Sequence, residues 1–100
     1  MQITKPNQDG QVTFLLEGRL DTITSSQLQA ELAPVVDAAQ GDIVLDLSSL
    51  AYISSAGLRV LLAAQKGVLA KGISMTIRNV CPEVMEVFDM TGFTEILNIL

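Results

Sequence analysis

Apolar and polar residues alternate early in the chain, with the period of two that is typical of a strand with one buried face. Val12, Phe14 and Leu16 are apolar, and mixed residues separate them. We expect residues 2–5 to pair with this strand through a turn at residues 7–10. The chain is therefore predicted to open with a β-hairpin.

The spacing of apolar residues then changes to that of a helix with one buried face. The segment Thr24-Ser25-Ser26-Gln27 fits a capping box, which predicts a helix that begins there and ends near Gly41. Pro34 lies inside this helix, where it removes one backbone hydrogen bond and favours a kink. The predicted buried stripe is Leu28, Leu32, Val35, Val36 and Ala39.

A continuous apolar run follows at residues 43–47, interrupted only by Asp46. Such a run is typical of a central strand that is covered on both faces. A serine-rich turn connects it to a second helix, which we expect to begin near Ser55. At 100° per residue, the predicted buried side of this helix contains Leu58, Leu61, Leu62, Val68 and Leu69, with Gln65 among them.

The opposite side of the second helix carries little charge for a solvated face. It combines two basic residues with small or β-branched ones, namely Arg59, Val60, Ala63, Lys66, Gly67 and Ala70. One interpretation is that the chain's own third helix covers part of this side. The alternative is a docking face for a partner, because small residues allow another helix to approach closely.

The remainder of the chain predicts a strand, a helix and a final strand. Ile73, Met75 and Ile77 alternate with polar residues, and Pro82 suits the first turn of a helix that stops at Gly92. The apolar residues of this helix are Val84, Met85, Val87 and Phe88. A last strand is expected at residues 96–100. The predicted fold class is α/β, a small sandwich in which helices pack on a mixed sheet made of the hairpin and parallel strands.

The chain has 100 residues, which is the size of one domain, and we expect residues 1–100 to form it. Its net charge is −5 and its six basic residues are scattered, so the basic surface of a nucleic-acid-binding protein is absent. The N-terminus lacks the pattern of a signal peptide, and no apolar run approaches the ~20 residues of a membrane span. We therefore expect a cytoplasmic protein that binds neither nucleic acid nor membrane.

The absence of histidine and the single cysteine exclude much of the common chemistry of enzymes and metal sites. The chain has no histidine, and Cys81 is its only cysteine. Ser-His-Asp and Cys-His catalysis are therefore excluded, and one thiol alone cannot form a zinc site or an intrachain disulfide. We expect no enzymatic activity, no cofactor and no bound metal.

The serine turn before the second helix is the strongest candidate for a functional site. Ser54 and Ser55 lie where free backbone N–H groups and the positive end of the helix dipole favour an anion, including a phosphate on a side chain. A simpler interpretation is that one of these serines only caps the helix. Ser54 and Ser55 by themselves do not distinguish a phosphorylation site from a helix cap.

Four short motifs follow one another along most of the chain, at residues 17–21 (EGRLD), 46–58 (DLSSLAYISSAGL), 79–84 (NVCPEV) and 90–93 (MTGF). Together they resemble the bacterial anti-sigma-factor antagonists, the free-standing members of the STAS domain family. The resemblance extends from about Val12 to the C-terminus. In that family, a partner that is both anti-sigma factor and serine kinase phosphorylates the serine that opens the helix, and the modification breaks the complex. By position, that serine is Ser55, and the resemblance also implies a serine phosphatase.

This chain departs from the family pattern immediately before that serine. The family often has Asp there, whereas this chain has Ser54, which becomes a second candidate for phosphorylation. Asp21 either contacts the partner or only shapes a turn. Arg59, one helical turn after Ser55, either contacts the phosphate or a partner carboxylate, or is a solvated charge. The predicted partner-binding residues are Asp21, Ser54, Ser55, Ala56, Gly57, Arg59, Val60 and Ala63.

The leading hypothesis is a protein-binding switch that regulates sigma-dependent transcription, in a protein that is a monomer or weak dimer. It sequesters an anti-sigma factor when unphosphorylated and releases it when Ser55 is phosphorylated. One alternative is an enzyme with Ser55 as nucleophile, although the chain has no histidine to act as base. A second is a nucleotide sensor whose helix N-terminus binds a phosphate directly. A third is a STAS domain of another pathway, such as a stress complex or a polarity switch.

Overall fold

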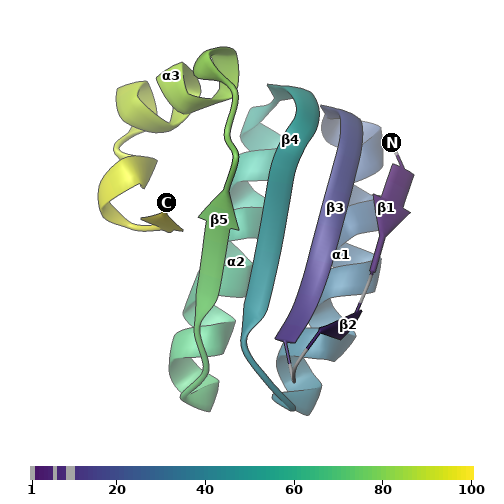
Figure 1. Cartoon of the computed structure of the whole chain (residues 1–100). Coiled ribbons are helices and arrows are strands. Elements are labelled where there is room, and N and C mark those ends of the chain that lie inside the picture. The colour runs from purple at the N-terminus through teal and green to yellow at the C-terminus, as the bar shows by residue number, and fades with distance from the viewer. Residues whose placement is uncertain (1, 6, 9–10) are drawn as a thin grey trace.

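One mixed β-sheet runs through the structure, and two long helices pack side by side against one of its faces (Figure 1). The computed structural model describes residues 2–5, 7–8 and 11–100. The described strands follow the order β1-β3-β4-β5-β6, and β2 pairs with β3. The elements in chain order are β1 (Gln2–Thr4), β2 (Asn7–Gln8), β3 (Gln11–Leu20), α1 (Thr22–Ala38), β4 (Ile43–Ile53), α2 (Ser55–Lys71), β5 (Met75–Arg78), α3 (Pro82–Thr91), the 3-10 helix η1 (Phe93–Glu95) and β6 (Asn98–Ile99).

The predicted N-terminal hairpin is confirmed, because β1 and β2 both pair antiparallel with β3. Part of the predicted turn at residues 7–10 is itself the short strand β2, and residues 9 and 10 lie outside the described residues. From β3 onward, the neighbouring strands are parallel. The mixed α/β fold predicted from the sequence is therefore confirmed.

β4 is the central strand, as its continuous apolar run predicted. It lies between β3 and β5, and residues 43–47 are all buried. Its apolar side chains join those of β3, α1 and α2 in one core, whose members include Phe14, Leu16, Leu28, Leu32, Leu45, Leu61 and Val68. Burial of this apolar surface is the main stabilising contribution to the fold. The core thereby fixes the two strand-to-helix turns that carry the candidate site.

The start of α1 was predicted wrongly, because the capping box lies three residues earlier. The Asp21 carboxylate accepts the backbone N–H groups of Ile23 and Thr24 at 3.1 and 3.0 Å, and the Asp21 N–H donates to the Thr24 hydroxyl at 2.8 Å. Thr24 therefore closes the box instead of opening it. The helix continues through the exposed Pro34 and ends at Ala38, before Ala39 in a left-handed conformation with φ 49°.

The buried side of α2 is turned relative to the prediction. Leu69 is 69% exposed, whereas Val60 is only 9% exposed and belongs to the core. The neighbour that covers this side is α1 and not the third helix, since a Cβ on Gly67 would lie 2.7 Å from Val36 of α1. A helix that packs against both a sheet and a neighbouring helix buries two sectors, and apolar spacing along the sequence does not reveal their orientation.

The C-terminal third follows the prediction for α3 and departs from it at the last strand. Pro82 begins α3, and Gly92 ends it in a left-handed conformation with φ 79°. β5 begins at Met75, two residues after the predicted alternation starts. The final strand β6 has only two residues, because the backbone N–H groups of Ile96 and Leu97 donate to the Phe93 carbonyl and not to a neighbouring strand. α3 lies beyond the end of β5, away from the N-terminal hairpin (Figure 1).

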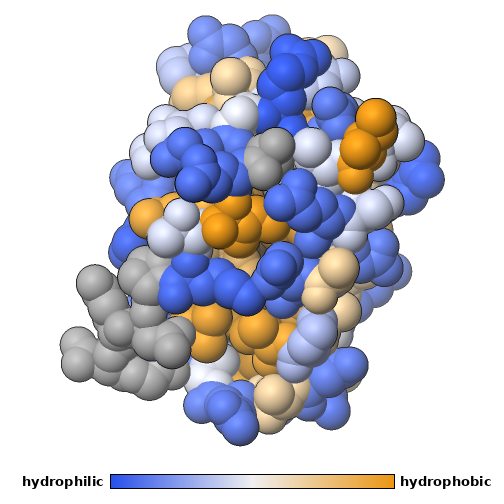
Figure 2. Space-filling model, turned by 90° about the vertical axis from the view of Figure 1, so that its right-hand side faces the viewer, coloured by the Kyte–Doolittle hydropathy of each residue, from blue (hydrophilic) through white to orange (hydrophobic). Residues whose placement is uncertain are grey.

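The side of the molecule formed by β1 and α1 is covered mostly by hydrophilic residues (Figure 2). An ion pair between Lys5 and Glu31 links the residue after β1 to α1. Hydrophobic surface shows on this side in separate areas between the polar side chains (Figure 2). Scattered apolar surface of this kind is ordinary for a folded domain and does not indicate a binding site.

Candidate functional site

The C-terminal ends of β3 and β4 bring two of the predicted site segments together. Leu20 pairs with Ile53 in these parallel strands, and the Ser54 N–H donates a hydrogen bond to the Leu20 carbonyl at 2.8 Å. Asp21 and Ser54 are the next residues of the two segments, and each is the N-cap of the helix that follows. The N-termini of α1 and α2 therefore lie at the same edge of the sheet (Figure 1).

Bulges in β4 set which residue arrives at this edge. Over the same paired span, β3 advances from residue 12 to 20 while β4 advances from residue 43 to 53. The two additional residues of β4 are accommodated where the register shifts, at residues 47–48 and at Ala51. A bulge bends its strand and re-aims the residues beyond it. Because of these two additional residues, Ile53 and not an earlier residue of β4 pairs with Leu20. Ser54 is the first residue after this pair.

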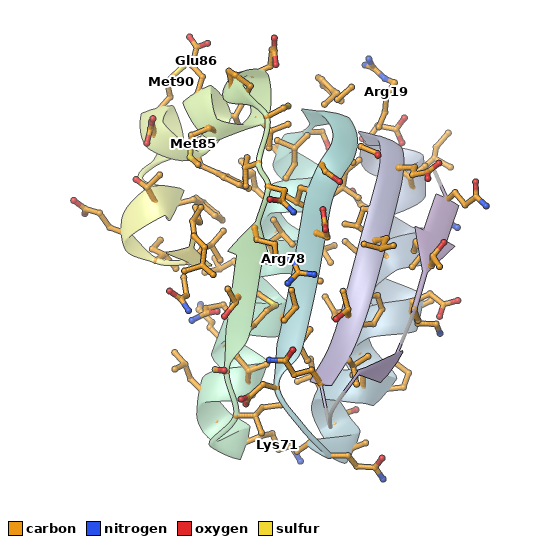
Figure 3. All side chains as sticks on the ribbon, in the orientation of Figure 1. Arg19, Lys71, Arg78, Met85, Glu86 and Met90 are labelled. Carbon is orange, nitrogen blue, oxygen red and sulfur yellow. The ribbon has the colours of Figure 1, made fainter. Side chains whose placement is uncertain are left out.

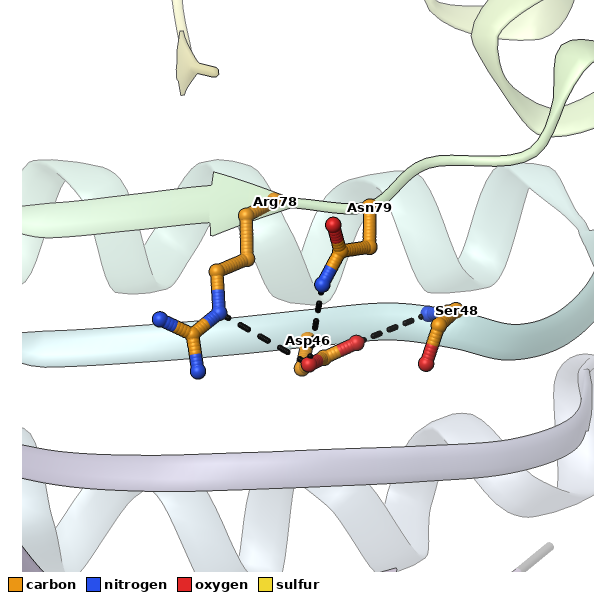
Figure 4. A network of polar contacts seen from close by, with 4 residues as sticks. All are labelled: Asp46, Ser48, Arg78 and Asn79. Carbon is orange, nitrogen blue, oxygen red and sulfur yellow. Dashed lines mark hydrogen bonds and ion pairs between the residues drawn. The ribbon is translucent and has the colours of Figure 1, made fainter.

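Asp46 is a buried carboxylate that holds the first bulge to the segment after β5 (Figure 4). Its Oδ1 accepts the Ser48 backbone N–H at 2.9 Å, and its Oδ2 accepts the Asn79 Nδ2–H at 3.1 Å. The Arg78 Nε lies 3.6 Å from Oδ2. Burial acts to raise the pKa of Asp46, but the hydrogen bonds from Ser48 and Asn79 and the charge of Arg78 together lower this pKa below its usual value. The carboxylate is therefore ionised at neutral pH.

The two adjacent serines lie in different environments. The Ser54 Oγ accepts the Gly57 backbone N–H at 3.3 Å, so Ser54 caps α2. Ser55 is the first residue of the helix, its side chain is exposed, and its hydroxyl makes no hydrogen bond to any residue that the structure describes. The capping interpretation therefore applies to Ser54, while Ser55 presents an uncommitted hydroxyl at the positive end of the helix dipole.

Gly57 allows the first turn of α2 to lie against the strand ends. It is buried, and a Cβ at this position would lie 2.8 Å from the Leu20 side chain and 2.9 Å from that of Ile53. The glycine therefore sets how closely α2 approaches the sheet, and with it the position of Ser55. Gly57 was predicted as a partner-binding residue, but the structure gives it a packing role.

A shallow hollow of about 330 Å³ lies between the first turns of α1 and α2. Its lining combines polar residues of α1 with predicted site residues of α2, namely Thr22, Ser25, Ser26, Gln29, Ala56, Arg59, Val60 and Ala63. Arg59 and Ala63 are exposed, as a docking face requires. The prediction of Val60 as part of an exposed face is wrong, because this side chain packs into the seam between the helices and only its edge reaches the hollow.

Asp21 has a structural role in the N-cap of α1. The backbone N–H of Thr24, its hydroxyl and the Ile23 N–H stabilise the ionised carboxylate, and they hold the pKa of Asp21 below its usual value. The alternative that this aspartate shapes the chain before a helix thus agrees with the structure. Its predicted contact with a partner stays a prediction, and so does that of the exposed Arg59.

Three exposed residues at this edge were not found by reasoning from the sequence. The Arg19 guanidinium carbon lies 4.1 Å from the centroid of the Tyr52 ring, and Ile23 is 82% exposed in the first turn of α1. Arg19 projects at the end of β3 (Figure 3). The signal was present, since Arg19 and Tyr52 belong to the two motifs at the strand ends. Their pairing depends on the bulges in β4, which the sequence did not reveal.

The described part of the chain offers neither a metal cluster nor a membrane anchor of helical type. Over residues 2–5, 7–8 and 11–100, the Cys, Asp and Glu side chains form no group of three or more that could hold a metal ion. No helix within these ranges is both long enough and apolar enough to cross a membrane.

Comparison of the sequence with known proteins gives one consistent result. The family model described as STAS domain matches residues 2–100. BtrV of Bordetella bronchiseptica, which is named as a candidate anti-sigma factor antagonist, is 40% identical over 96 residues, or 96% of this chain and 83% of the relative. The anti-sigma F factor antagonist of Paenibacillus polymyxa is 32% identical over 100 residues, or 99% of this chain and 86% of the relative.

Solved structures show the same fold at lower sequence identity. The anti-sigma factor antagonist SpoIIAA, solved in unphosphorylated and phosphorylated forms, matches with a TM-score of 0.77 and 18% identity in both cases. The match covers 99% of this chain and 87% and 91% of the two SpoIIAA chains. An anti-sigma factor antagonist from Mycobacterium paratuberculosis matches with a TM-score of 0.89 and 21% identity, over 98% of this chain and 83% of that one.

Proposed function

This chain belongs to the STAS domain family, and on that premise we propose that it is an anti-sigma factor antagonist whose binding is controlled by phosphorylation of Ser55. When unphosphorylated, it sequesters a partner that is both anti-sigma factor and serine kinase, so that the sigma factor is free. Phosphorylation releases the partner, and a serine phosphatase restores the binding form. The names of the relatives support the antagonist role over nearly the whole chain.

The observation that carries the switch is the contrast between the two serines. Ser54 is only partly exposed, and its Oγ already accepts the Gly57 N–H as the cap of α2. Ser55 is exposed, and a kinase can reach its hydroxyl without disturbing the cap. The exposed hollow between the first turns of the helices offers this partner kinase a surface formed by both α1 and α2. SpoIIAA, which has this fold, was solved in a phosphorylated form, so phosphorylation is compatible with the fold.

The phosphate acts on the interface and not on the fold. It adds about −1.5 to −2 charges at the N-terminus of α2, where negative charge is favourable by roughly 0.3–1 kcal/mol at an exposed position. We therefore expect the modified protein to stay folded. A hundredfold loss of partner affinity requires ~2.8 kcal/mol, which bulk and repulsion from acidic groups of the partner can supply.

A binding role also agrees better with the site than a catalytic one. A serine nucleophile requires a neighbouring base within hydrogen-bond distance. Among the described residues, none accepts a hydrogen bond from the Ser55 hydroxyl. The site therefore supports Ser55 as a substrate of another enzyme.

Mass spectrometry after incubation with ATP and a lysate of the source organism tests the phosphorylation. Fragment ions that separate the two serines should place the phosphate on Ser55. The Ser54→Ala variant should still be modified, and the Ser55→Ala variant should not. Phosphate on Ser54 alone, or no phosphate where other lysate proteins are labelled, would refute the switch.

Binding to the purified kinase tests the second half of the proposal. Ser55→Glu should weaken binding at least tenfold in calorimetry, because it places a charge on the helix N-terminus. Ser49→Glu, which adds the same charge at another exposed serine, is the matched control and should bind as the unmodified chain does. If both variants bound the kinase with equal affinity, phosphorylation of Ser55 would not control the release of the partner.

A further inference from the structure

Gly18 has a backbone conformation that is unusual within a strand. Its φ is 104°, and the other described glycines with positive φ, Gly72 and Gly92, both lie at the ends of helices. A residue with a Cβ is strained at such a φ, whereas glycine adopts it freely. Gly18 is exposed, so this backbone conformation, and not close packing, favours glycine at the position.

Gly18 lies opposite the second bulge of β4. It pairs with Leu50, and the next residue, Arg19, pairs with Tyr52, which leaves Ala51 as the additional residue of β4. Among the described residues, β1 pairs with β3 only before Gly18, so the end of β3 pairs with β4 alone. A bulge bends the strand that contains it. The positive φ of Gly18 redirects β3 at the same level, so that the two strands stay paired beyond it.

The two residues after Gly18 hold the starts of both long helices. The Arg19 carbonyl accepts the Thr24 hydroxyl of α1 at 2.7 Å, and the Leu20 carbonyl accepts the Ser54 N–H at 2.8 Å. The helix α2 begins directly after Ser54. The direction in which the chain leaves Gly18 therefore sets where the first turn of α2 lies.

We propose that Gly18 is a positioning residue for the phosphorylation of Ser55. It acts through the Leu20 carbonyl, which holds Ser54 and with it the first turn of α2. This inference rests on the proposed function and concerns how the chain presents the acceptor hydroxyl to the kinase.

The reaction itself makes the position of the hydroxyl important. The Ser55 Oγ attacks the γ-phosphorus of ATP, the bond from this phosphorus to the bridging oxygen breaks, ADP leaves, and the hydroxyl proton passes to a base of the kinase. Catalysis of phosphoryl transfer consists mostly of positioning and charge stabilisation. A misplacement of the reacting atom by about 1 Å can lower the rate ~100-fold.

A side chain at position 18 should displace the acceptor hydroxyl and leave the domain folded. Because L-residues rarely adopt a φ near 104°, we expect alanine to relax this angle, which rotates the chain beyond it. The Leu20 carbonyl then moves, and the first turn of α2 moves with it or loses its hydrogen bond. Leu58, Leu61 and Val68 still hold the rest of α2 in the core.

Steady-state phosphorylation with ATP tests this inference, with a kinase purified from the lysate by its activity on Ser55. Gly18→Ala should lower kcat at least tenfold and change KM less than twofold, because the variant still binds but its hydroxyl is misplaced. A loss of stability alone predicts the reverse. Unfolding lowers the fraction of competent substrate, which raises KM in proportion and leaves kcat unchanged.

Gly72→Ala is the matched control. It adds the same Cβ to a glycine with a φ of 74°, at the end of α2 opposite to Ser55, where the Cβ would meet no atom within 4 Å. It should introduce similar backbone strain and keep kcat within twofold of the unmodified chain. Gly18→Asn is a second variant, and it should lose less kcat than Gly18→Ala because asparagine tolerates positive φ better.

The outcomes separate this inference from the proposed function. If the unmodified chain is not phosphorylated on Ser55, the proposed function fails and the inference fails with it. If Ser55 is phosphorylated and Gly18→Ala keeps its kcat, the inference is overturned, but the switch stands. An equal loss of kcat in Gly72→Ala would show a general effect of strain and would also overturn it. If circular dichroism shows that Gly18→Ala is unfolded at the assay temperature, Gly18→Asn replaces it, and an unchanged kcat of that variant overturns the inference.

Discussion

Replacing Asp46 by alanine should destabilise the protein strongly and in a pH-dependent way. The substitution removes the carboxylate that joins the first β4 bulge to the segment after β5. The Ser48 N–H and the Asn79 side-chain amide then lose their acceptor, in two hydrogen bonds that are part-buried. Arg78 loses a weaker contact, because its Nε is 3.6 Å away and its side chain is 42% exposed.

The magnitude follows from these contacts. A hydrogen bond to a charged group contributes ~1.5–3 kcal/mol. Two such bonds are lost, and the lower end of this range applies to each, because Ser48 and Asn79 are exposed residues whose donors can bind water instead. We therefore expect a loss of about 3 kcal/mol in the free energy of unfolding. For a domain of this size, that corresponds to a fall in Tm of more than ~10 °C. Asp46→Asn keeps the shape and one acceptor oxygen and should cost less.

The pH dependence has a definite sign. The pKa of Asp46 is lowered in the folded protein, so its ionised form stabilises the fold above its ordinary pKa of 3.8. This contribution is lost as the pH falls below 3.8 and passes through the lower folded pKa. The difference between the unmodified chain and Asp46→Ala should therefore be largest near pH 7 and shrink towards pH 3.

Urea unfolding followed by circular dichroism measures both effects. The assay compares the unmodified chain, Asp46→Ala and Asp46→Asn at pH 7 and at pH 3, with Asp37→Ala as a control at an exposed carboxylate. Asp37→Ala should change stability by less than ~0.5 kcal/mol. A loss for Asp46→Ala no larger than that of the control would refute the reasoning. An equal loss at both pH values would contradict the role of the charge.

Three further predictions address the candidate site. Ser54→Ala should lower stability by about 1 kcal/mol in thermal unfolding, because α2 loses its cap, and stability equal to the unmodified chain would show that the 3.3 Å bond contributes nothing. Gly57→Ala should lower stability by ~1 kcal/mol or more, because overpacking against Leu20 and Ile53 costs more than alanine gains through its helix propensity. A stabilised variant would disprove the close approach of α2 to these two side chains. Ala63→Glu should weaken kinase binding at least tenfold with Tm within a few degrees, whereas Ala30→Glu, at an exposed position of α1, should bind normally. Unchanged binding of Ala63→Glu would remove the hollow from the interface.

Much of the fold was predictable because the decisive patterns are local. The continuous apolar run of β4 indicates a central strand wherever that strand lies, and Pro82 and Gly92 delimit α3 through backbone geometry alone. The capping box of α1 was misplaced because Thr, Ser and Asp are all good N-cap residues, and the sequence around Asp21 and Thr24 offers more than one start. The structure selects Asp21 because Leu20 is held by its partner strand, which leaves α1 to begin immediately after it.

The candidate site, like the fold, was predictable from the sequence only in part. The serine turn and its resemblance to the STAS family were evident from residues 46–58, since the motif is continuous in the sequence. The distinction between Ser54 as cap and Ser55 as exposed hydroxyl was not evident, because both serines suit a helix N-terminus. It depends on the hydrogen bond between Ser54 and the Leu20 carbonyl, which joins segments far apart in the chain.

The sequence by itself determined the α/β order of elements, the central strand, and the serine turn at the start of a helix, because hydrophobic period and turn chemistry act over a few residues. Only the tertiary structure decided that two bulges place Ser54 beside the end of β3, that Val60 is buried against α1, and that Leu69 is exposed. These features depend on the register between strands and on which neighbours a helix contacts. Such contacts join residues distant in sequence, and no local pattern specifies them.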